Sequence, residues 1–380
     1  DKIINAEFNL INNLIHVNHA AVAPWPKRTQ LAVSQFAEEN AAQGSLNYPA
    51  WLEQENTLRQ QCQRLINADS SDEISLLKST SEALSAVAYG LDWQAGDSVV
   101  TSAEEFPSNR LLWQSLKQFG VEVRLVDYKT GDDAEQLIID ACDKTTKLLS
   151  ISAVQYSSGR RMQLQKLGDY CQAHSILFCV DAIQQLGALQ FDVNKIHADF
   201  VAADGHKWML GAEGLALFYC RRQHIDKLKL NQYGWHMVEN HHDFSASDWQ
   251  PAKTARRFEC GSPNMLGIMA LSASLSLLEE IDLAEIEERI LDNTDYLIKE
   301  LSALANIEII SSTIPEHRAG IVTFKHTKLD NQVLFDYLQE QHVFAALRGG
   351  GIRLSPHFYT QRKQLEQLVA LITQASSLAI

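Results

Sequence analysis

Short apolar runs alternate with helix-like patterns from about Asp72 to Arg221. There are seven such runs: EISLL, DSVV, VEVRLV, KLLSISAV, ILFCV, DFVAA and LALFY. Apolar runs of this length, separated by amphipathic helical stretches, are typical of buried strands joined by crossover helices. The pattern therefore predicts an α/β domain with a mainly parallel sheet covered by helices on both faces.

The segments outside this region follow other patterns. The stretch NHAAVAPWP contains prolines in positions that favour irregular structure over a helix interior, and amphipathic helices follow it to about Leu65. After residue 258 we expect a helix with Ser262 as its N-cap and Pro263 at its first position. A second helix is predicted to begin with the capping-box-like pair Asp282 and Glu285.

The last part of the chain, with strand-like IEII and GIVTF and a closing helix, predicts a small α+β domain. A chain of 380 residues is long enough for two domains. We therefore expect an N-terminal arm over residues 1–28 that packs with the small domain, a large domain over residues 29–258, and a small C-terminal domain over residues 259–380.

Composition and charge exclude some functions. The chain is 46% hydrophobic and 21% charged, with a net charge of −14. Such an acidic protein is not expected to bind nucleic acid or an anionic membrane, and an anionic substrate would need a local cluster of arginines. No apolar run approaches the roughly 18 residues of a membrane span.

The cysteine pattern indicates free thiols. Cysteine is found at six scattered positions without a CxxC pair: Cys62, Cys142, Cys171, Cys179, Cys220 and Cys260. This pattern favours reduced thiols in a cytoplasmic protein over disulfides or zinc. The pair His241 and His242 is more typical of a solvated loop than of a metal site, so we expect no metal. The chain starts at Asp1 without a methionine, which is compatible with removal of an upstream segment and leaves periplasmic export open.

Lys207 and Asp181 carry the strongest chemical signal. A lone lysine in a glycine-rich turn is usually a surface residue, but here Asp181 ends an apolar strand about two dozen residues upstream. A lysine beside a sheet can hold the aldehyde of pyridoxal phosphate (PLP) as a Schiff base, while a carboxylate keeps the pyridine nitrogen protonated. Partial burial would also depress the pKa of the lysine.

The segments around these two residues, DAIQQLGALQFDV and ADFVAADGHKWMLGAEG, resemble the cofactor region of class V aminotransferases, within the fold-type I PLP enzymes. The resemblance extends from HVNHAAVAPWP to GGGIRLSPHFY. That family also contains cysteine desulfurases, selenocysteine lyases, kynureninases and isopenicillin N epimerase-like proteins. The resemblance implies a seven-stranded mainly parallel sheet, PLP bound to Lys207, and a homodimer whose sites use residues of both subunits.

The resemblance also implies which residues hold the cofactor phosphate. Thr80, Ser81 and His206 match phosphate contacts, and Ser262 matches a residue that reaches the phosphate of the neighbouring subunit. From the residues alone, Thr80 and Ser81 mark only a helix N-terminus, a favourable place for an anion. Asp204, in the same ADGHK segment, is expected at the cofactor as well.

The cofactor ring is expected to have three further partners. Phe106, in AEEFPSN, matches a stacking position where relatives have histidine or phenylalanine, although a core phenylalanine is the alternative. A phenylalanine cannot transfer a proton, so a desulfurase-type histidine acid or base is missing. Gln184 matches a residue that hydrogen-bonds the cofactor's phenolic oxygen, and Gln155 stands where relatives often have asparagine; both side chains can donate.

Arg353, in GGGIRLSPHFYT, resembles the arginine that binds the α-carboxylate of the substrate, which a guanidinium can do bidentately. Asn18 and His19 are expected at the substrate too. Arg348 could meet a second acidic group, or be a solvated loop residue. The three glycines after it lack the ending of a P-loop.

The segment HVFAALRGGGIR contains no cysteine, whereas desulfurases place their nucleophilic cysteine just before this arginine. We therefore expect an enzyme that binds an amino acid at Lys207, first of all an aminotransferase. A C–S or C–Se β-lyase or an isopenicillin N epimerase-like enzyme is the alternative, and a cysteine desulfurase or a non-catalytic PLP-fold protein is less favoured. Lys207 would be the general base and acid at Cα, and Asp181 would keep the ring an electron sink.

Overall fold

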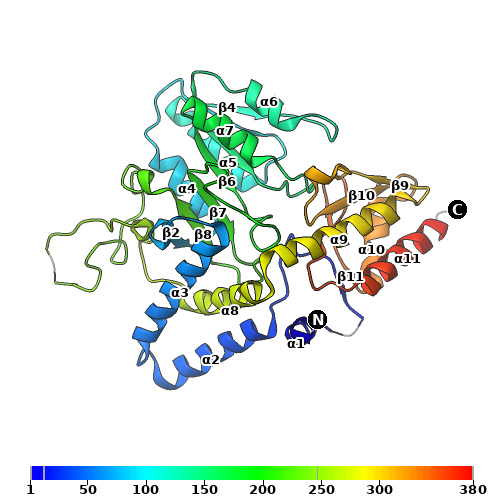
Figure 1. Ribbon diagram of the computed structural model, residues 1–380, viewed down its shortest axis with the longest axis horizontal. Coiled ribbons are helices and arrows are strands. Elements are labelled where there is room, and N and C mark those ends of the chain that lie inside the picture. The colour runs from blue at the N-terminus through cyan, green and yellow to red at the C-terminus, as the bar shows by residue number, and fades with distance from the viewer. Residues whose placement is uncertain (1, 12, 246, 379–380) are drawn as a thin grey trace.

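The computed structural model describes residues 2–11, 13–245 and 247–378. A large domain built on one sheet lies beside a smaller domain that contains the C-terminal helices (Figure 1). The seven strands of the large sheet are β2 (Ile74–Leu77), β3 (Ser98–Ser102), β4 (Glu122–Val126), β5 (Thr146–Ser152), β6 (Leu177–Asp181), β7 (Phe200–Asp204) and β8 (Ala216–Cys220).

The strand order is β2-β8-β7-β6-β5-β3-β4, and β8 alone runs antiparallel to its neighbours. All seven predicted strands are present, and the mainly parallel α/β fold is confirmed. Every residue of β3, β7 and β8 is buried, whereas the edge strand β4 is mostly exposed or half-buried. Burial on both faces explains why the inner strands have nearly continuous apolar sequences.

Helices cover the sheet and connect its strands. Those of the large domain are α2 (Lys27–Gln43), α3 (Tyr48–Ile66), α4 (Thr80–Gly90), α5 (Pro107–Ser115), α6 (Ala134–Asp140), α7 (Leu164–His174) and α8 (Met265–Ile281). Because the central strands are parallel, their carboxyl ends meet at one edge, where a doubly wound sheet usually binds its ligand. Asp181 ends β6 and Asp204 ends β7, so both carboxylates lie at this edge.

The small domain has a four-stranded antiparallel sheet in the order β12-β13-β10-β9. Its elements are α9 (Leu283–Ser302), β9 (Ile307–Ile309), β10 (Val322–His326), α10 (Asn331–Glu340), β11 (Val343–Phe344), β12 (Ala346–Arg348), β13 (Gly351–Leu354) and α11 (Arg362–Leu378). In the arm, α1 (Lys2–Glu7) precedes β1 (Ile15–His16), which pairs in parallel with β11. The arm also reaches the large domain, where the Ala23 N–H donates to the His206 carbonyl at 2.9 Å.

Two details differ from the sequence-based expectation. The helix α8 packs on α2 and α3, and its Leu271 and Leu275 belong to the main core of the large domain, so the large domain extends beyond residue 259. Ser262 is not the N-cap of α8. That helix begins at Met265, and the Asn264 side chain accepts from the Gly267 N–H at 3.0 Å.

A buried ion cluster ties α3 to the segment that precedes α8. Arg59 donates to both carboxylate oxygens of Glu259 at 2.6 and 2.7 Å and also to Glu55. Within the described chain, one group (Glu55, His236 and Glu259) brings possible metal ligands together. The Arg59 guanidinium already donates to both carboxylates, so the cluster is better explained as a structural clamp than as a cation site.

Arg59→Met should lower the free energy of unfolding by about 3–5 kcal/mol, because it removes the guanidinium that donates to two buried carboxylates. Arg64→Met on the same helix is the matched control. The ion pair of Arg64 with Glu279 is exposed, so its loss should cost less than about 1 kcal/mol. Urea denaturation of both variants measures the difference, and equal losses would contradict the structural role of Arg59.

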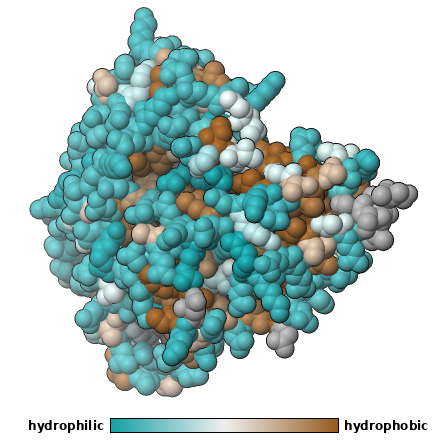
Figure 2. Space-filling model, turned by 45° about the vertical axis from the view of Figure 1, so that its right-hand side comes forward, coloured by the Kyte–Doolittle hydropathy of each residue, from teal (hydrophilic) through white to brown (hydrophobic). Residues whose placement is uncertain are grey.

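Among the described helices, none has both the length and the apolar character needed to cross a membrane. The face shown in Figure 2 is largely hydrophilic, and its hydrophobic residues gather mainly around a notch in the outline.

Candidate active site

Asp181 is held at the end of β6 with only 2% of its surface exposed. The Ile183 N–H donates to its Oδ1 at 3.1 Å. Burial raises the pKa of the Asp181 carboxyl to about 7, with a further contribution from the nearby Glu105 carboxylate. A positive charge placed against this carboxylate would restore its ionised form, as the protonated nitrogen of a pyridine ring can do.

Lys207 lies three residues beyond the end of β7, in the turn that leads towards β8. Burial lowers the pKa of its ammonium to about 8, although the Asp181 carboxylate opposes this shift. A useful fraction of the amine is therefore neutral near neutral pH, as a nucleophile or base requires.

Phe106 faces this lysine. The Lys207 Nζ lies 5.7 Å from the centre of the Phe106 ring, and the Phe106 and Tyr156 rings are nearly perpendicular, with their centres 5.2 Å apart. Phe106 is 42% exposed, so it is not the core phenylalanine that the sequence left as an alternative. An exposed aromatic face beside a partly buried lysine can stack on a planar ligand.

The predicted phosphate corner is at the start of α4. Ser79 is the N-cap of this helix, and Thr80 is its first residue. The Thr80 N–H donates to Asp204 Oδ2 and the Asp204 N–H donates to Thr80 Oγ1, each at 2.9 Å. This reciprocal pair joins α4 to β7. Ser81 Oγ donates to Ser108 Oγ at 2.8 Å, and His206 Nδ1 lies 3.8 Å from Asp204 Oδ1.

The two glutamines are held by protein contacts. Gln184 Nε2 donates to the Ala20 carbonyl at 3.0 Å, and its Oε1 accepts from Trp208 Nε1 at 2.8 Å. Gln155 Nε2 donates to Glu105 at 2.9 Å, which leaves its Oε1 buried without a partner. A hydrogen bond from either amide to a ligand oxygen would therefore use its second Nε2 hydrogen.

Arg353 is positioned by β13 and is 3% exposed. Its Nη1 donates to the Tyr156 carbonyl at 2.7 Å, and its Nε is buried without a partner. Burial lowers the pKa of the guanidinium to about 10, with the positive charge of Arg348 as a further cause. A buried cation with unused donors is suited to an anionic ligand group.

Asn18 and His19 lie in the arm beside β13. Asn18 forms a bridge with Ser355, and its Oδ1 is buried without a hydrogen-bond partner. His19 is fully buried, with Nδ1 2.8 Å from the Ser355 carbonyl and Nε2 2.6 Å from the Tyr359 hydroxyl. Both ring nitrogens of His19 thus already have protein partners, a geometry that favours a positioning role over direct substrate contact.

Ser262 is exposed and precedes α8. Its hydroxyl accepts from Trp235 Nε1 at 3.4 Å. It lines a pocket of about 440 Å³ together with Lys78 and Glu82, next to the start of α4. Its predicted contact with a phosphate of another subunit stays a prediction.

Several predicted site residues have buried polar atoms without a hydrogen-bond partner. These atoms are Asn18 Oδ1, Gln155 Oε1, His206 Nδ1 and Arg353 Nε. Most buried polar atoms in folded proteins have a partner, so these four are available to a ligand. Together with the Lys207 amine, the Asp181 carboxylate and the open Phe106 face, they fit the groups of PLP and of an amino acid.

The sequence alone did not identify two residues that shape this site. Glu105 accepts from the Ser152 N–H and from the Gln155 and Asn109 side chains, and burial raises its pKa. The Tyr156 carbonyl orients Arg353. Glu105 directly precedes Phe106 in the sequence, and this position is the one feature of the sequence that could have indicated its place in the site.

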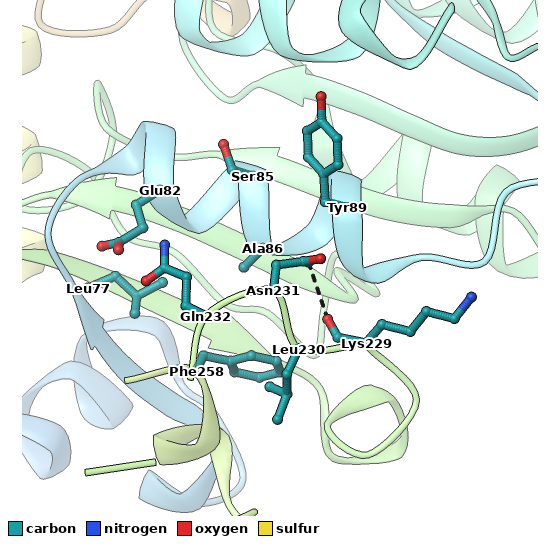
Figure 3. A pocket seen from close by; sticks show the side chains of 10 residues that line it. All are labelled: Leu77, Glu82, Ser85, Ala86, Tyr89, Lys229, Leu230, Asn231, Gln232 and Phe258. Atoms are coloured by element: carbon teal, nitrogen blue, oxygen red, sulfur yellow. Dashed lines mark hydrogen bonds between the residues drawn. The ribbon is translucent and has the colours of Figure 1, made fainter. Parts of the chain in front are cut away.

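A separate pocket of about 160 Å³ lies on the outer side of α4 (Figure 3). None of the ten residues that line it belongs to the predicted site. The ammonium of its one lysine, Lys229, pairs with Asp92, and Asn231 donates to the Lys229 carbonyl. Its polar groups do not converge on a common point, so we assign no ligand to it.

Comparison with known proteins gives a consistent result. A family model described as aminotransferase class-V matches residues 15–368. A probable cysteine desulfurase of Methanothermobacter thermautotrophicus is 29% identical over 96% of this chain and 95% of its own length. The apo cysteine desulfurase of Thermococcus onnurineus NA1 superposes with a TM-score of 0.88 at 23% identity, covering 99% of this chain and 98% of the other. The cystine C–S lyase C-DES, solved with its reaction product cysteine persulfide, gives a TM-score of 0.89 at 20% identity over 95% and 98%.

Proposed function

Since the chain belongs to the aminotransferase class-V family and is a PLP-dependent enzyme, we propose that it cleaves the Cβ–S bond of a sulfur-containing amino acid. The sequence alone favoured transamination and kept the C–S or C–Se β-lyase as the alternative. The names of the similar proteins support this alternative better, because they include a probable cysteine desulfurase and a cystine C–S lyase.

The observation that carries the proposal is that the buried charges of Asp181 and Arg353 both act on the partly buried Lys207. When bound, PLP withdraws electrons from Cα of an amino acid. Lys207 holds the cofactor, and its neutral Nζ then takes the Cα proton, a role that its lowered pKa supports. The Asp181 carboxylate stabilises positive charge on the ring nitrogen, and the Arg353 guanidinium orients the α-carboxylate.

Other chain residues support this arrangement. Phe106 would stack on the bound ring, and Gln184 and Gln155 would donate to its oxygen. Thr80, Ser81 and His206 would hold the phosphate, while Asp204 fixes the start of α4 against β7. Asn18 accepts a hydrogen bond from the ligand through its unpaired Oδ1, and His19 keeps the arm in place.

The proposed elimination of the sulfur group from the amino acid needs no added oxidant or reductant. The Cα proton moves to Lys207, the Cβ–S bond breaks, and the electron pair leaves on sulfur as a thiolate. Addition of water then gives pyruvate and ammonia, so that the total change is substrate plus water to thiol, pyruvate and ammonium.

We do not propose a persulfide on the protein. Cys62, Cys179 and Cys220 are buried, and burial raises the pKa of each thiol, which disfavours the reactive thiolate. Cys260 is half-buried with its Sγ 3.1 Å from Gln232 Oε1. The hairpin that carries Arg353 contains no cysteine.

The same proposal includes a homodimer and a cytoplasmic location. Ser262 is exposed beside the start of α4, and Phe244 and Trp249 are exposed on a loop that projects from the large domain (Figure 1), as expected of a surface that meets a second copy. All six cysteines are free, which agrees with a reducing compartment.

Product analysis tests the reaction. The purified enzyme would be incubated with a panel of amino acids, including cysteine and cystine, while pyruvate, sulfide, selenide, alanine and pyridoxamine phosphate are measured. We expect pyruvate together with released sulfur product. Alanine with sulfane sulfur would indicate a desulfurase, pyridoxamine phosphate a transaminase, and inverted substrate alone an epimerase.

A variant with all six cysteines replaced by serine or alanine should retain pyruvate formation within about threefold, because no thiol takes part in the proposed reaction. Thermal unfolding of the same sample serves as the folding control. Persulfide detected on a wild-type cysteine, with activity lost when that cysteine alone is replaced, would overturn the lyase assignment.

A further inference from the structure

We propose that Arg348 and Arg353 together select a substrate with two anionic groups, namely the α-carboxylate and a second acidic group at the end of the side chain. The inference rests on the proposed function, and within it the substrate class becomes a sulfur amino acid whose sulfur substituent carries a carboxylate. Arg353 binds the α-carboxylate, and Arg348 binds the acidic group of the side chain.

The hairpin of β12 and β13 places the two arginines on one face. Ala346 pairs with Arg353 and Arg348 pairs with Gly351 across this hairpin, while the intervening pair is Leu347 with Ile352. Directly opposed residues share a face, and the next pair points to the other face. Arg348 and Arg353 are therefore diagonal neighbours on the same face, with Cα atoms about 7–8 Å apart.

Small residues lie opposite both arginines, Ala346 opposite Arg353 and Gly351 opposite Arg348, so neither guanidinium is paired with a long side chain across the hairpin. The backbone at Gly351 packs against the Phe324 carbonyl and Ile310, so a ligand would reach the arginines from the side of Ala346. On the other face, Ile352 is fully buried in the core of the small domain, which directs the arginine face away from that core. Arg353 also acts electrostatically on Lys207, so this face is turned to the active site.

The tip of the hairpin is held against the active-site turn. Gly349 and Gly350 both have positive φ, as a tight hairpin turn requires. A Cβ at Gly349 would lie 3.1 Å from the Ser157 Cβ, so the tip packs closely on the segment whose Tyr156 carbonyl holds Arg353. This packing fixes the backbone of the hairpin next to Arg348.

Neither arginine has an acidic partner within the described residues. Arg348 donates only to the carbonyl of Leu347, and Arg353 only to that of Tyr156. Glu105, in the adjoining segment, is engaged by Ser152, Gln155 and Asn109, and Glu104 accepts from Ser158. Two like charges placed side by side repel each other until an anion comes between them.

The charge of the whole chain strengthens this argument. A protein with a net charge of −14 repels anions in general, yet two cations without acidic partners share one face of the β12–β13 hairpin. A local field of this kind attracts a substrate with more negative charge than a neutral amino acid carries. The α-carboxylate of the substrate needs only one arginine, Arg353, which leaves Arg348 for a second anionic group.

A matched pair of substrates tests the proposal on the PLP-loaded enzyme. S-(carboxymethyl)-L-cysteine and S-(carbamoylmethyl)-L-cysteine have nearly the same shape and differ by one negative charge. We expect kcat/KM for pyruvate formation to be roughly tenfold higher for the acid, mainly through KM, since a hydrogen-bonded charge pair contributes on this scale. Arg348→Gln should remove this preference, so that the ratio of kcat/KM for the acid to kcat/KM for the amide falls to about one.

Arg222→Gln is the matched control, because it removes one exposed positive charge elsewhere on the surface. It should keep the roughly tenfold preference. A preference that is absent in the wild type, or that persists in Arg348→Gln, would overturn the proposal.

A binding measurement separates this inference from the proposed reaction. Adipate has four chain atoms between its two carboxylates, as S-(carboxymethyl)-L-cysteine has, but it lacks the amine and the sulfur. Calorimetry should show adipate binding roughly tenfold tighter than its monoamide, with the difference lost in Arg348→Gln. Tighter binding of adipate than of its monoamide, with no pyruvate formed from any substrate, would contradict the lyase reaction and support the two-arginine site. Equal binding of the two ligands, or no binding of either, would contradict the two-arginine site.

Discussion

Lys207→Ala should abolish turnover and remove the visible absorption band that the wild-type protein shows with PLP. The band requires a covalent link between the aldehyde and an amine, and Lys207 offers an amine with a lowered pKa beside the Phe106 ring. Loss of the general base alone reduces rates by about 10²–10⁴, and the variant loses the attachment as well. PLP should still bind noncovalently, because the phosphate contacts and Asp181 remain.

Borohydride reduction followed by peptide mapping identifies the attachment site. In the wild type the label should be found on the peptide that contains Lys207. Lys195→Ala provides a control, because this exposed lysine belongs to another part of the surface. Label on any other lysine, or an unchanged band in Lys207→Ala, would refute the assignment.

The large sheet was predictable because its strands are buried on both faces. A strand such as β7 must be apolar throughout, and this signal remains clear in a single sequence. The polar residue that ends such a strand then stands out, as Asp181 and Asp204 do. Parallel strands bring their carboxyl ends together, so these two carboxylates lie at the same edge of the sheet.

Helix boundaries and domain edges were less predictable. Ser262 with Pro263 is a good N-terminal signal, yet the helix begins two residues later because Asn264 caps Gly267. The helix α8 precedes the small domain in sequence but is buried against α2 and α3. Which surface covers an apolar helix is decided by tertiary packing, and local sequence carries little information about it.

Several contacts within the site could not be derived from single residues. The reciprocal hydrogen bonds of Thr80 and Asp204 join positions 124 residues apart. Both ends of the Gln184 amide are hydrogen-bonded, to Ala20 and to Trp208. The residue type alone could not show that the amide has only one hydrogen left to donate to a ligand. Arg348 was ambiguous in the sequence, and only the pairing of β12 with β13 places it on the same face as Arg353.

Asp181→Asn should lower kcat by about 10²–10³ while leaving the fold and the covalent attachment of PLP intact. Asparagine has nearly the same shape, so the variant removes the charge and little else. The position at the end of β6, where one oxygen is fixed by the Ile183 N–H, gives the carboxylate a set orientation towards a ring nitrogen. Without it the ring nitrogen is not held protonated, and charge developing at Cα is poorly stabilised.

A pH series on the PLP-free protein tests the same residue independently of activity. Burial raises the pKa of Asp181 from 3.8 to about 7, so in the folded state the proton is retained at pH values where an unfolded chain has lost it. Folding is therefore disfavoured by this group as the pH rises from about 4 to about 7, and Asp181→Asn should gain stability relative to the wild type over that window. Urea denaturation at pH 5 and pH 8 measures the difference, which should be larger at pH 8. Near-normal turnover in Asp181→Asn, or a stability difference independent of pH, would show that the carboxylate at the end of β6 has another role.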